Sequence, residues 1–421
     1  MISCTLKKIL FLTASYPDAR GSATMLCTHR VMEYVAGSGR YEVHALAMRR
    51  DSESMQETAG KIMVHRFRPS LWTRVRNRLS DTKSYPRIAR MMEVLQKAVT
   101  IPSYPNVLPV TGRRYFRKAA RLHGRERFDI VISEYHGIET LLAGCRLKKA
   151  FPGLKHIALL WDPVMGQIAT GYLPGSFTSR RIERLERLAA ACSTALVSTR
   201  SMRPYYTEHG DIASDIRVYL DIPGVRPPGE ENGTVWLSLL KEGCINIVFS
   251  GLLSVQQRNP LPVIRLLGKC KCAGRINLVF FSTGAKEAIE NEAGSFPGSI
   301  VHHDYIPLNE LHTVYRHADY LLNVSHINAK MVPSKIFEYM SFGKPVISTY
   351  VTPGDSAARY LGRYPEALCI DLGKPDGDNV EDLEHFLSKP HAPVPFELVR
   401  EEFKENTSAP FLALIDKIAG A

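Results

Sequence analysis

The chain has 421 residues, a length that corresponds to two or three domains of ordinary size. Apolar residues make up 45% and charged residues 23%, which is typical of a globular protein and excludes disordered and fibrous classes. Lys and Arg number 54 against 42 Asp and Glu, and this net charge of +12 predicts an anionic partner.

The positive charge is concentrated in one early segment. Residues 49–127 contain 19 basic and 6 acidic residues, a net charge of +13, whereas the remainder of the chain carries a net charge of −1. Anionic partners of such a segment include nucleic acid, lipid headgroups and phosphorylated substrates. No helix-turn-helix or aromatic-basic signature is present, so we expect no nucleic acid as a partner.

The apolar runs are too short to cross a bilayer, which needs about 18–20 apolar residues, and this excludes an integral membrane protein. Residues 7–14 have the basic-then-apolar order of a short signal peptide, but they fit a first core strand better. The eight cysteines show no C-x-x-C spacing, which favours free thiols in a reducing compartment. We therefore expect a cytoplasmic protein that rests on the inner face of the cell membrane.

In the first half of the chain, short apolar runs alternate with amphipathic stretches. Strands are predicted at 8–12, 42–47, 62–67, 130–133, 156–160, 194–198 and 216–219. Helices are predicted at 25–36, 138–149 and 181–191. This alternation is typical of a mostly parallel sheet that is covered by helices.

A stretch rich in Pro and Gly, 221–236, interrupts the pattern, which then resumes. Further strands are predicted at 245–250, 278–282, 299–302, 320–324, 345–349 and 367–370, and a helix at 260–269. The sequence thus predicts an α/β protein of two doubly wound Rossmann-like domains that face each other across a cleft. The predicted parts are an acceptor-binding domain 1–225, a linker 226–242, a donor-binding domain 243–395, and a helical segment 396–421 that packs back on the first domain.

The most informative segment is 332–349, with the sequence VPSKIFEYMSFGKPVIST. Ser334 fits the N-terminal cap of a short helix, and Gly343 fits the left-handed position just past its end. Lys335 and the helix start would attract an anion such as a diphosphate, and Glu338 could accept hydrogen bonds from two adjacent hydroxyls. The alternative is an ordinary amphipathic helix with a solvent-facing Lys–Glu pair.

The run P-S-K-I-F-E-Y-M-S-F-G-K-P-V-I resembles the nucleotide-sugar-binding segment of family 4 glycosyltransferases, which have the GT-B fold. The order of weaker segments along almost the whole chain is also similar. These are the first strand with its glycine-bearing loop (10–23), the strand at 128–132, the segments 188–198 and 218–225, the donor-domain opening at 249–253, and the stretch 301–322.

The resemblance implies a retaining transferase that uses a nucleotide-sugar donor, with no cofactor and no metal. It implies that Arg258 and Lys335 hold the diphosphate with help from Ser334, and that Glu338 binds the ribose. Asp162 matches the region where the family keeps a His–Asp pair, so it would contact the transferred sugar. The loop residues Gly21 and Ser22 either offer backbone N–H groups to the donor phosphate or the acceptor, or they only form a tight turn.

Several positions depart from the family pattern. Lys330 stands where the family commonly has a second glutamate near the donor sugar, so Asn328 or a backbone group would read the sugar, or the donor carries an acidic group. Leu252 stands where a basic residue usually follows the glycine of the first donor-domain strand. Trp161 next to Asp162 either stacks on the sugar or is a core aromatic, and Arg258 either binds phosphate or lies in a solvated loop.

The leading hypothesis is a retaining hexosyl-type transferase for a surface glycan or glycolipid, with a glycan or lipid-linked acceptor. A nucleotide-sugar epimerase or hydrolase of the same fold is an alternative, with Asp162, Glu134 and His136 as acid–base candidates. A catalytically silent nucleotide-sugar binder is another, because of Lys330 and Leu252. The mixture of Trp72 with arginines and aliphatic residues suggests that 49–127 rests on anionic lipid, with a solvated basic face as the alternative.

Overall fold

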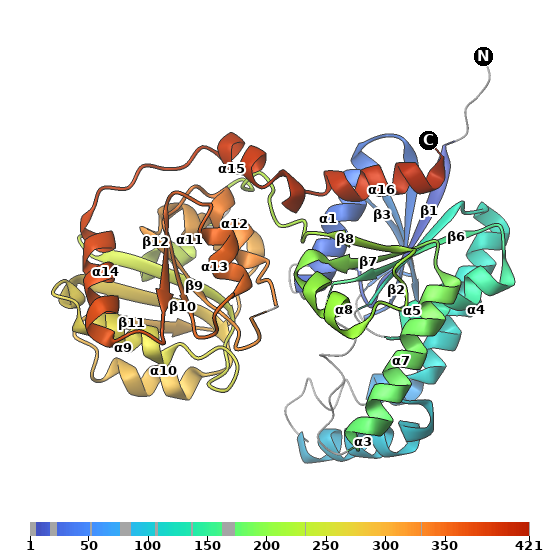
Figure 1. The fold of residues 1–421 in the computed structure, drawn as a ribbon, viewed down its shortest axis with the longest axis horizontal. Helices are drawn as coiled ribbons and strands as arrows, with labels where there is room; N and C mark the ends of the chain where they lie inside the picture. The colour runs from blue at the N-terminus through green and yellow to red at the C-terminus, as the bar shows by residue number, and fades with distance from the viewer. Residues whose placement is uncertain are drawn as a thin grey trace. The chain divides into compact units, whose positions relative to one another are not determined.

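The computed structural model describes residues 6–16, 23–50, 53–75, 86–105, 108–135, 138–161, 173–231, 233–329 and 331–420. The chain forms two compact units, one of residues 1–221 with 408–421 and one of residues 222–407 (Figure 1). No helix in these ranges is long and apolar enough to cross a membrane.

The first unit is built on an eight-stranded sheet in the order β3-β4-β2-β1-β5-β6-β7-β8, in which only the β3–β4 pair is antiparallel. Its strands are β1 (Lys7–Leu12), β2 (Tyr41–Met48), β3 (Gln56–Ala59), β4 (Ile62–Phe67), β5 (Ile130–Glu134), β6 (Lys155–Leu160), β7 (Ala195–Thr199) and β8 (Arg217–Leu220). Its helices include α1 (Ala23–Gly37), α3 (Pro86–Thr100), α4 (Pro109–Glu126), α5 (Ile138–Ala150), α7 (Gly175–Cys192), α8 (Arg203–His209) and α16 (Ala409–Ala419).

The second unit has a six-stranded sheet, parallel throughout, in the order β11-β10-β9-β12-β13-β14. Its strands are β9 (Ile245–Leu252), β10 (Ile276–Thr283), β11 (Ser299–His303), β12 (Tyr320–Val324), β13 (Val346–Tyr350) and β14 (Ala367–Asp371). Its helices include α9 (Leu261–Lys269), α10 (Lys286–Ala293), α11 (Leu308–His317), α12 (Lys335–Ser341), α13 (Ser356–Leu361), α14 (Asp376–Ser388) and α15 (Phe396–Glu402).

Both faces of the second sheet are buried, because side chains alternate along each strand. Val248 and Leu321 point into a core with α11, α12 and α13, whereas Phe249 and Leu322 point into a core with α9 and α14 on the opposite face. Strands that are buried on both sides need continuous apolar runs, and such runs can be recognised in the sequence. The predicted α/β class with two doubly wound parallel sheets is confirmed.

The ends of the two units differ from the predicted boundaries. Residues 222–242 belong to the second unit, since Trp236 packs against its core and donates a hydrogen bond from Nε1 to Glu310. Helix α15 also belongs there, because Val399 and Phe403 are buried in that core. Only 408–421 returns to the first unit, where Asp416 accepts a 2.7 Å hydrogen bond from the hydroxyl of Tyr41.

Candidate functional site

The second sheet reverses its strand order between β9 and β12, which are neighbours in the sheet although β10 and β11 intervene in the chain. In open α/β sheets, ligands bind outside the carboxyl ends of the strands at such a switch point. Arg258 follows β9, Asn328 follows β12, and α12 follows in turn with Lys335 and Glu338. The sequence-predicted donor residues of this unit therefore sit in the segments that follow the two switch-point strands.

Glu338 is the centre of a buried polar cluster on α12. The residue is 3% exposed, and its Oε1 atom accepts a 3.0 Å hydrogen bond from Lys335 Nζ. His312 Nε2 on α11 lies 3.2 Å from the same oxygen, and Arg226 Nη2 lies 3.4 Å from that nitrogen. A buried carboxylate needs such partners, because an unpaired one would cost several kcal/mol. The solvent-facing Lys–Glu pair considered from the sequence is therefore wrong for Glu338.

Lys335 also contacts a second hydrogen-bonded group of side chains, which includes two buried tyrosines. Lys335 Nζ donates a 3.1 Å hydrogen bond to Tyr315 Oη, which is in turn hydrogen-bonded to Ser250 Oγ. The Ser250 N–H donates to Tyr339 Oη at 3.2 Å, and the rings of Tyr315 and Tyr339 meet edge to face at 5.2 Å. Burial raises the pKa of both phenols, so they stay neutral. These hydrogen bonds connect β9, α11 and α12 next to the Lys335–Glu338 pair.

The position of α12 also depends on a close backbone contact. A Cβ atom placed on Gly224 would lie 2.5 Å from the Cβ of Phe337, so only glycine fits there. Nearby, the Arg226 N–H donates to Ser341 Oγ at 3.4 Å, and the Val225 N–H donates to the Asn406 carbonyl at 3.0 Å. The segment 222–226 therefore lies directly against the helix that carries Lys335 and Glu338.

The two ends of α12 differ in how well the sequence predicted them. Gly343 has a φ of +67°, and a Cβ there would lie 2.4 Å from the Val394 carbonyl oxygen, which confirms the left-handed position past the helix. The Ser334 hydroxyl makes no capping hydrogen bond, and its backbone is helical, at φ −60° and ψ −21°. The predicted serine cap is therefore wrong, because an N-cap side chain needs an extended backbone to reach the next N–H groups.

Arg258 lies in a folded loop rather than in a fully solvated one. Its N–H donates a 2.8 Å hydrogen bond to the Ser254 carbonyl, and the Ile327 N–H after β12 donates to the Gln257 carbonyl at 2.9 Å. Burial lowers the pKa of Arg258, although the carboxylate of Asp355 opposes this effect. The loops after β9 and β12 are therefore joined, and the guanidinium lies within electrostatic reach of the Tyr339 hydroxyl below Lys335.

Asn328 and Leu252 are both exposed at this edge of the sheet. The Asn328 N–H donates to His326 Nδ1 at 2.9 Å, and its side chain belongs to the exposed part of the loop. Leu252 is 62% exposed, so an aliphatic side chain stands at the carboxyl end of β9, where a cation would be expected from the resemblance. Lys330 lies outside the described residues, as do Gly21, Ser22, Asp162 and His136 of the first unit.

Sequence reasoning missed two side chains of this site. His312 contacts Glu338 and lies on a different helix, so no local pattern links the two residues. Asp355 begins α13, where it accepts hydrogen bonds from the Ala358 N–H at 2.9 Å and from Ser325 Oγ at 3.1 Å. Burial raises the pKa of Asp355, and the positive charge of Arg258 opposes that rise. Its position directly after a Pro-Gly pair is a turn and helix-start signal that could have identified it.

The corresponding switch point of the first sheet lies between β1 and β5, and it holds a buried carboxyl group. Glu134 ends β5, is fully buried, and lies 2.5 Å from Thr13 Oγ1 through its Oε2 atom. Burial raises the pKa of Glu134 to about 7, against the opposing effect of the Thr13 and Thr28 hydroxyls. Its Oε1 atom has no hydrogen-bond partner among the described residues.

The hydrogen bonds of Thr13 support a protonated Glu134. Thr13 Oγ1 lies 3.0 Å from the Ser15 carbonyl as well as 2.5 Å from Glu134, but a hydroxyl has only one proton to donate. If Glu134 is protonated, its O–H donates to Thr13, and Thr13 donates to Ser15. Among the described residues Glu134 is fully buried, and its hydrogen bond to Thr13 connects the end of β5 to the segment after β1.

Trp161 belongs to the core of the first unit. It is 6% exposed, its Nε1 donates a 2.7 Å hydrogen bond to Thr28 Oγ1, and its ring lies 5.3 Å from that of Phe411. Of the two sequence-based interpretations, the core aromatic is therefore the one that the structure supports.

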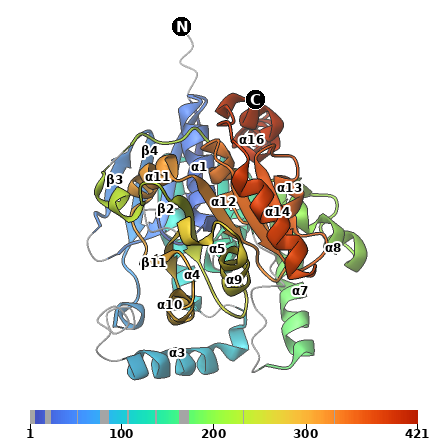
Figure 2. The same cartoon turned by 90° about the vertical axis from the view of Figure 1, so that its left-hand side faces the viewer.

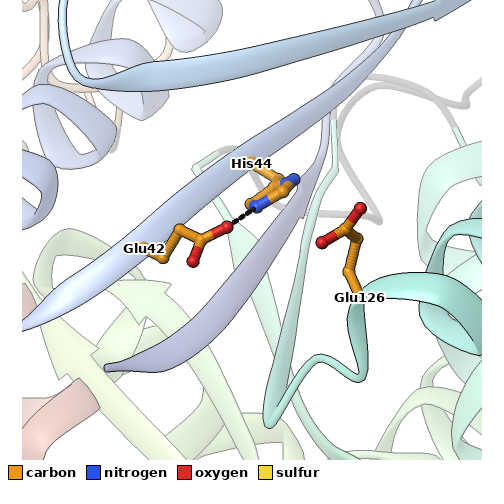
Figure 3. Close-up of side chains that lie close together, drawn as sticks. All are labelled: Glu42, His44 and Glu126. Atoms are coloured by element: carbon orange, nitrogen blue, oxygen red, sulfur yellow. Dashed lines mark hydrogen bonds and ion pairs between the residues drawn. The ribbon is translucent and has the colours of Figure 1, made fainter. Parts of the chain in front are cut away.

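One group of metal-capable side chains occurs in the described part of the chain, formed by Glu42, His44 and Glu126 (Figure 3). His44 Nε2 lies 2.7 Å from Glu42 Oε1, but Lys8 Nζ lies 3.1 Å from Glu42 and 3.0 Å from Glu126. The lysine ammonium thus lies between the two carboxylates and forms an ion pair with each of them. This cluster therefore serves as an ion-pair network in the first sheet.

No protein-family model and no curated protein sequence matches the chain, but solved structures match nearly all of it. An α,α-trehalose-phosphate synthase (UDP-forming) from Burkholderia xenovorans is 12% identical, with a TM-score of 0.62 over 99% of this chain and 100% of that one. The lipopolysaccharide outer core galactosyltransferase WaaB is 13% identical, with a TM-score of 0.54 over 98% and 99%.

A UDP-GlcNAc 2-epimerase from Methanocaldococcus jannaschii is similar as well, at 8% identity and a TM-score of 0.56 over 97% of this chain and 99% of that one. At such low identities the likeness concerns the fold. The chain therefore has the GT-B fold, with two Rossmann-like domains.

We predict that Gly224→Ala destabilises the second unit by about 1–3 kcal/mol, because the new methyl group has to displace Phe337 or the 222–226 backbone. Urea denaturation measures this as a lower transition midpoint. Gly377→Ala is the matched control, since nothing lies within 4 Å of its Cβ position. Equal stabilities of Gly224→Ala and the wild type would contradict the close contact.

We also predict a pH-dependent stability term from Glu134. Its pKa is about 7 in the folded state and 4.5 in the unfolded state, so the native state holds an extra proton between these values. This stabilisation is complete below pH 4.5 and is lost as the pH rises through 7, by about 3 kcal/mol in all. Glu134→Gln should therefore lose less stability than the wild type between pH 5 and pH 8, as measured by urea unfolding.

The control for this experiment is Glu33→Gln on α1, which changes an exposed carboxylate. It should keep the slope of the wild type. A Glu134→Gln protein with the same slope as the wild type would show that the carboxyl group is not protonated in the folded state.

Proposed function

We propose that the protein is a retaining glycosyltransferase that moves a sugar from a nucleotide-diphosphate donor to a glycan or lipid-linked acceptor, in the synthesis of a surface polysaccharide or glycolipid. The observation that carries this proposal is the Lys335–Glu338–His312 cluster on α11 and α12, beside the switch point of a GT-B donor sheet. The 332–349 segment that resembles family 4 supplies two members of this cluster.

The Glu338 carboxylate is already held in place by hydrogen bonds, which suits it to bind a ribose. It accepts hydrogen bonds from Lys335 and is close to His312, and a ribose diol would supply two hydroxyl donors of the same kind. The Lys335 side chain is 27% exposed, so it can turn from Glu338 toward a donor phosphate while the hydroxyls replace it. The exchange keeps the buried carboxylate paired throughout.

Lys335 and Arg258 would neutralise the diphosphate as it leaves. In the transfer, the bond between the anomeric carbon and the diphosphate oxygen breaks, and the acceptor oxygen bonds to that carbon on the same face. The acceptor proton ends on the released nucleoside diphosphate. Fixed cations that face the leaving oxygens lower the barrier because negative charge develops there in the transition state.

Asn328 and Lys330 would bind the donor sugar, and Ser334, at the start of the α12 segment, would assist in donor binding. A lysine where the family commonly has a glutamate favours a donor with an acidic sugar, since Lys330 would pair with its carboxylate. In the first unit, Asp162 would face the transferred sugar, and the backbone of Gly21 and Ser22 would face the donor phosphate. We propose that the reaction needs no cofactor and no metal, because the two cations take over charge neutralisation.

The experiment that tests this function is a nucleotide-release assay with UDP-, GDP- and ADP-sugars, with and without a lipid-extract acceptor. Release that requires the acceptor, with sugar found on the lipid, is the expected result. Release without acceptor, accompanied by a rearranged sugar, would instead support an epimerase like the structurally similar Methanocaldococcus protein. Binding without turnover would support a silent subunit.

We predict that Glu338→Ala and Lys335→Ala each lose donor binding. Each removes one charge-assisted interaction of about 1.5–3 kcal/mol, which corresponds to a loss of about 10- to 100-fold or more in affinity. Isothermal titration with the donor that supports turnover measures this loss. Glu397→Ala on α15 and Lys286→Ala on α10 are exposed controls in the same unit and should bind as the wild type. Unchanged affinity in both site variants would refute the assignment of the site.

A further inference from the structure

Helix α3 of the first unit carries a row of apolar side chains on its exposed side. Met91 is 65% exposed, Leu95 53% and Val99 70%, and Val94 beside them is 60% exposed. Ile88, 42% exposed, extends the row by one turn toward the start of the helix. Steps of three and four residues place these side chains on one face of the helix. The described part of the first unit leaves this face uncovered.

The helical turn 71–75 adds to the same surface. Leu71 is 70% exposed, Trp72 40% and Val75 49%, whereas Thr73 between them is buried. The Trp72 indole N–H donates a 3.0 Å hydrogen bond to Gln96 Oε1, which joins the turn to α3. We call these two segments the α3 surface: Ile88, Met91, Val94, Leu95 and Val99 with Leu71, Trp72 and Val75. Figures 1 and 2 show α3 beyond the β-sheet of the first unit, near one end of α7.

An apolar surface of this kind needs an explanation. Burying one aliphatic side chain of this size contributes about 1.5–3 kcal/mol of free energy. A partner that covers the whole row would therefore gain a large favourable free energy of association. Contiguous exposed apolar groups on a soluble domain mark a site for a protein or a membrane. A Trp with an apolar ring and a polar N–H is typical of the membrane–water interface.

The positive charge of the neighbouring helix α4 favours a membrane over a protein as the partner. Arg113, Arg117 and Arg121 are exposed and follow one another at intervals of four residues, so they form one ridge along the helix. Like charges at this spacing destabilise a helix by a few tenths of a kcal/mol per pair. None of the three forms an ion pair with another described residue. Arg74 and Arg90 place two more exposed cations next to the α3 surface.

We propose that the α3 surface inserts into the interface of an anionic lipid bilayer, with the α4 arginines on the headgroups. A second copy of the chain fits less well, because it would bring a second segment of net charge +13 to the same contact. This inference deepens the proposed function and rests on it in one respect: a membrane-bound transferase would meet a lipid-linked acceptor at the surface where that acceptor lies. The binding of lipid itself is measured independently of donor and acceptor.

The test is flotation of the full chain with vesicles of phosphatidylcholine alone and of phosphatidylcholine with phosphatidylglycerol in equal parts. The wild type should float only with the anionic vesicles, and less so at high salt. The double variant Arg113→Gln, Arg117→Gln should bind about thirtyfold more weakly, because each cation near the membrane surface contributes about 1 kcal/mol. Leu95→Gln with Val99→Gln should weaken it by on the order of tenfold or more.

Matched controls are Arg146→Gln, an exposed cation on α5, and Leu398→Gln, a side chain 61% exposed on α15. Both should float as the wild type. Equal recovery of the wild type with the two vesicle types would overturn the proposal. A wild-type dimer in analytical sedimentation that becomes a monomer in the Leu95→Gln, Val99→Gln double variant would also overturn it. An assay of nucleotide release from the sugar donor, with a soluble acceptor, separates the two proposals, since it tests the transferase whether or not the protein floats.

Discussion

The structure of the second unit depends on keeping one carboxylate paired away from water. Glu338 is buried on a short helix, and its partners Lys335 and His312 come from α12 and α11. Tyr315 extends the network to Ser250 on β9. A buried network is stable only when all its members are satisfied, so the switch-point strand and both helices are held in one arrangement. The Glu338 carboxylate is thus held in one position by its neighbours.

Much of the fold was predictable from the sequence, but the long-range contacts were not. Strands such as β9 and β12 are buried on both sides and read as short apolar runs, and Gly343 marks the end of α12 by its backbone conformation. In contrast, nothing near Glu338 in the sequence points to His312. Helix α4 was missed because its arginines conceal a narrow apolar face. The site was therefore predictable where its residues share one helix, and not where tertiary packing brings them together.

The two switch points hold carboxyl groups in different surroundings. Glu338 pairs with the ammonium of Lys335 and lies beside His312, whereas burial raises the pKa of Glu134 and favours its neutral form. Glu134 ends strand β5 and holds the segment after β1 through Thr13, whereas Glu338 lies on helix α12 and, in the proposed function, binds donor hydroxyls.

The path of the chain has a consequence for the order in which the protein is made. The second unit, 222–407, is inserted before the last helix of the first unit, α16. On the ribosome, all six strands of the second sheet emerge while the Trp161 ring still lacks its neighbour Phe411. The second unit can fold during synthesis, but the first must wait with part of its core open until α16 has emerged.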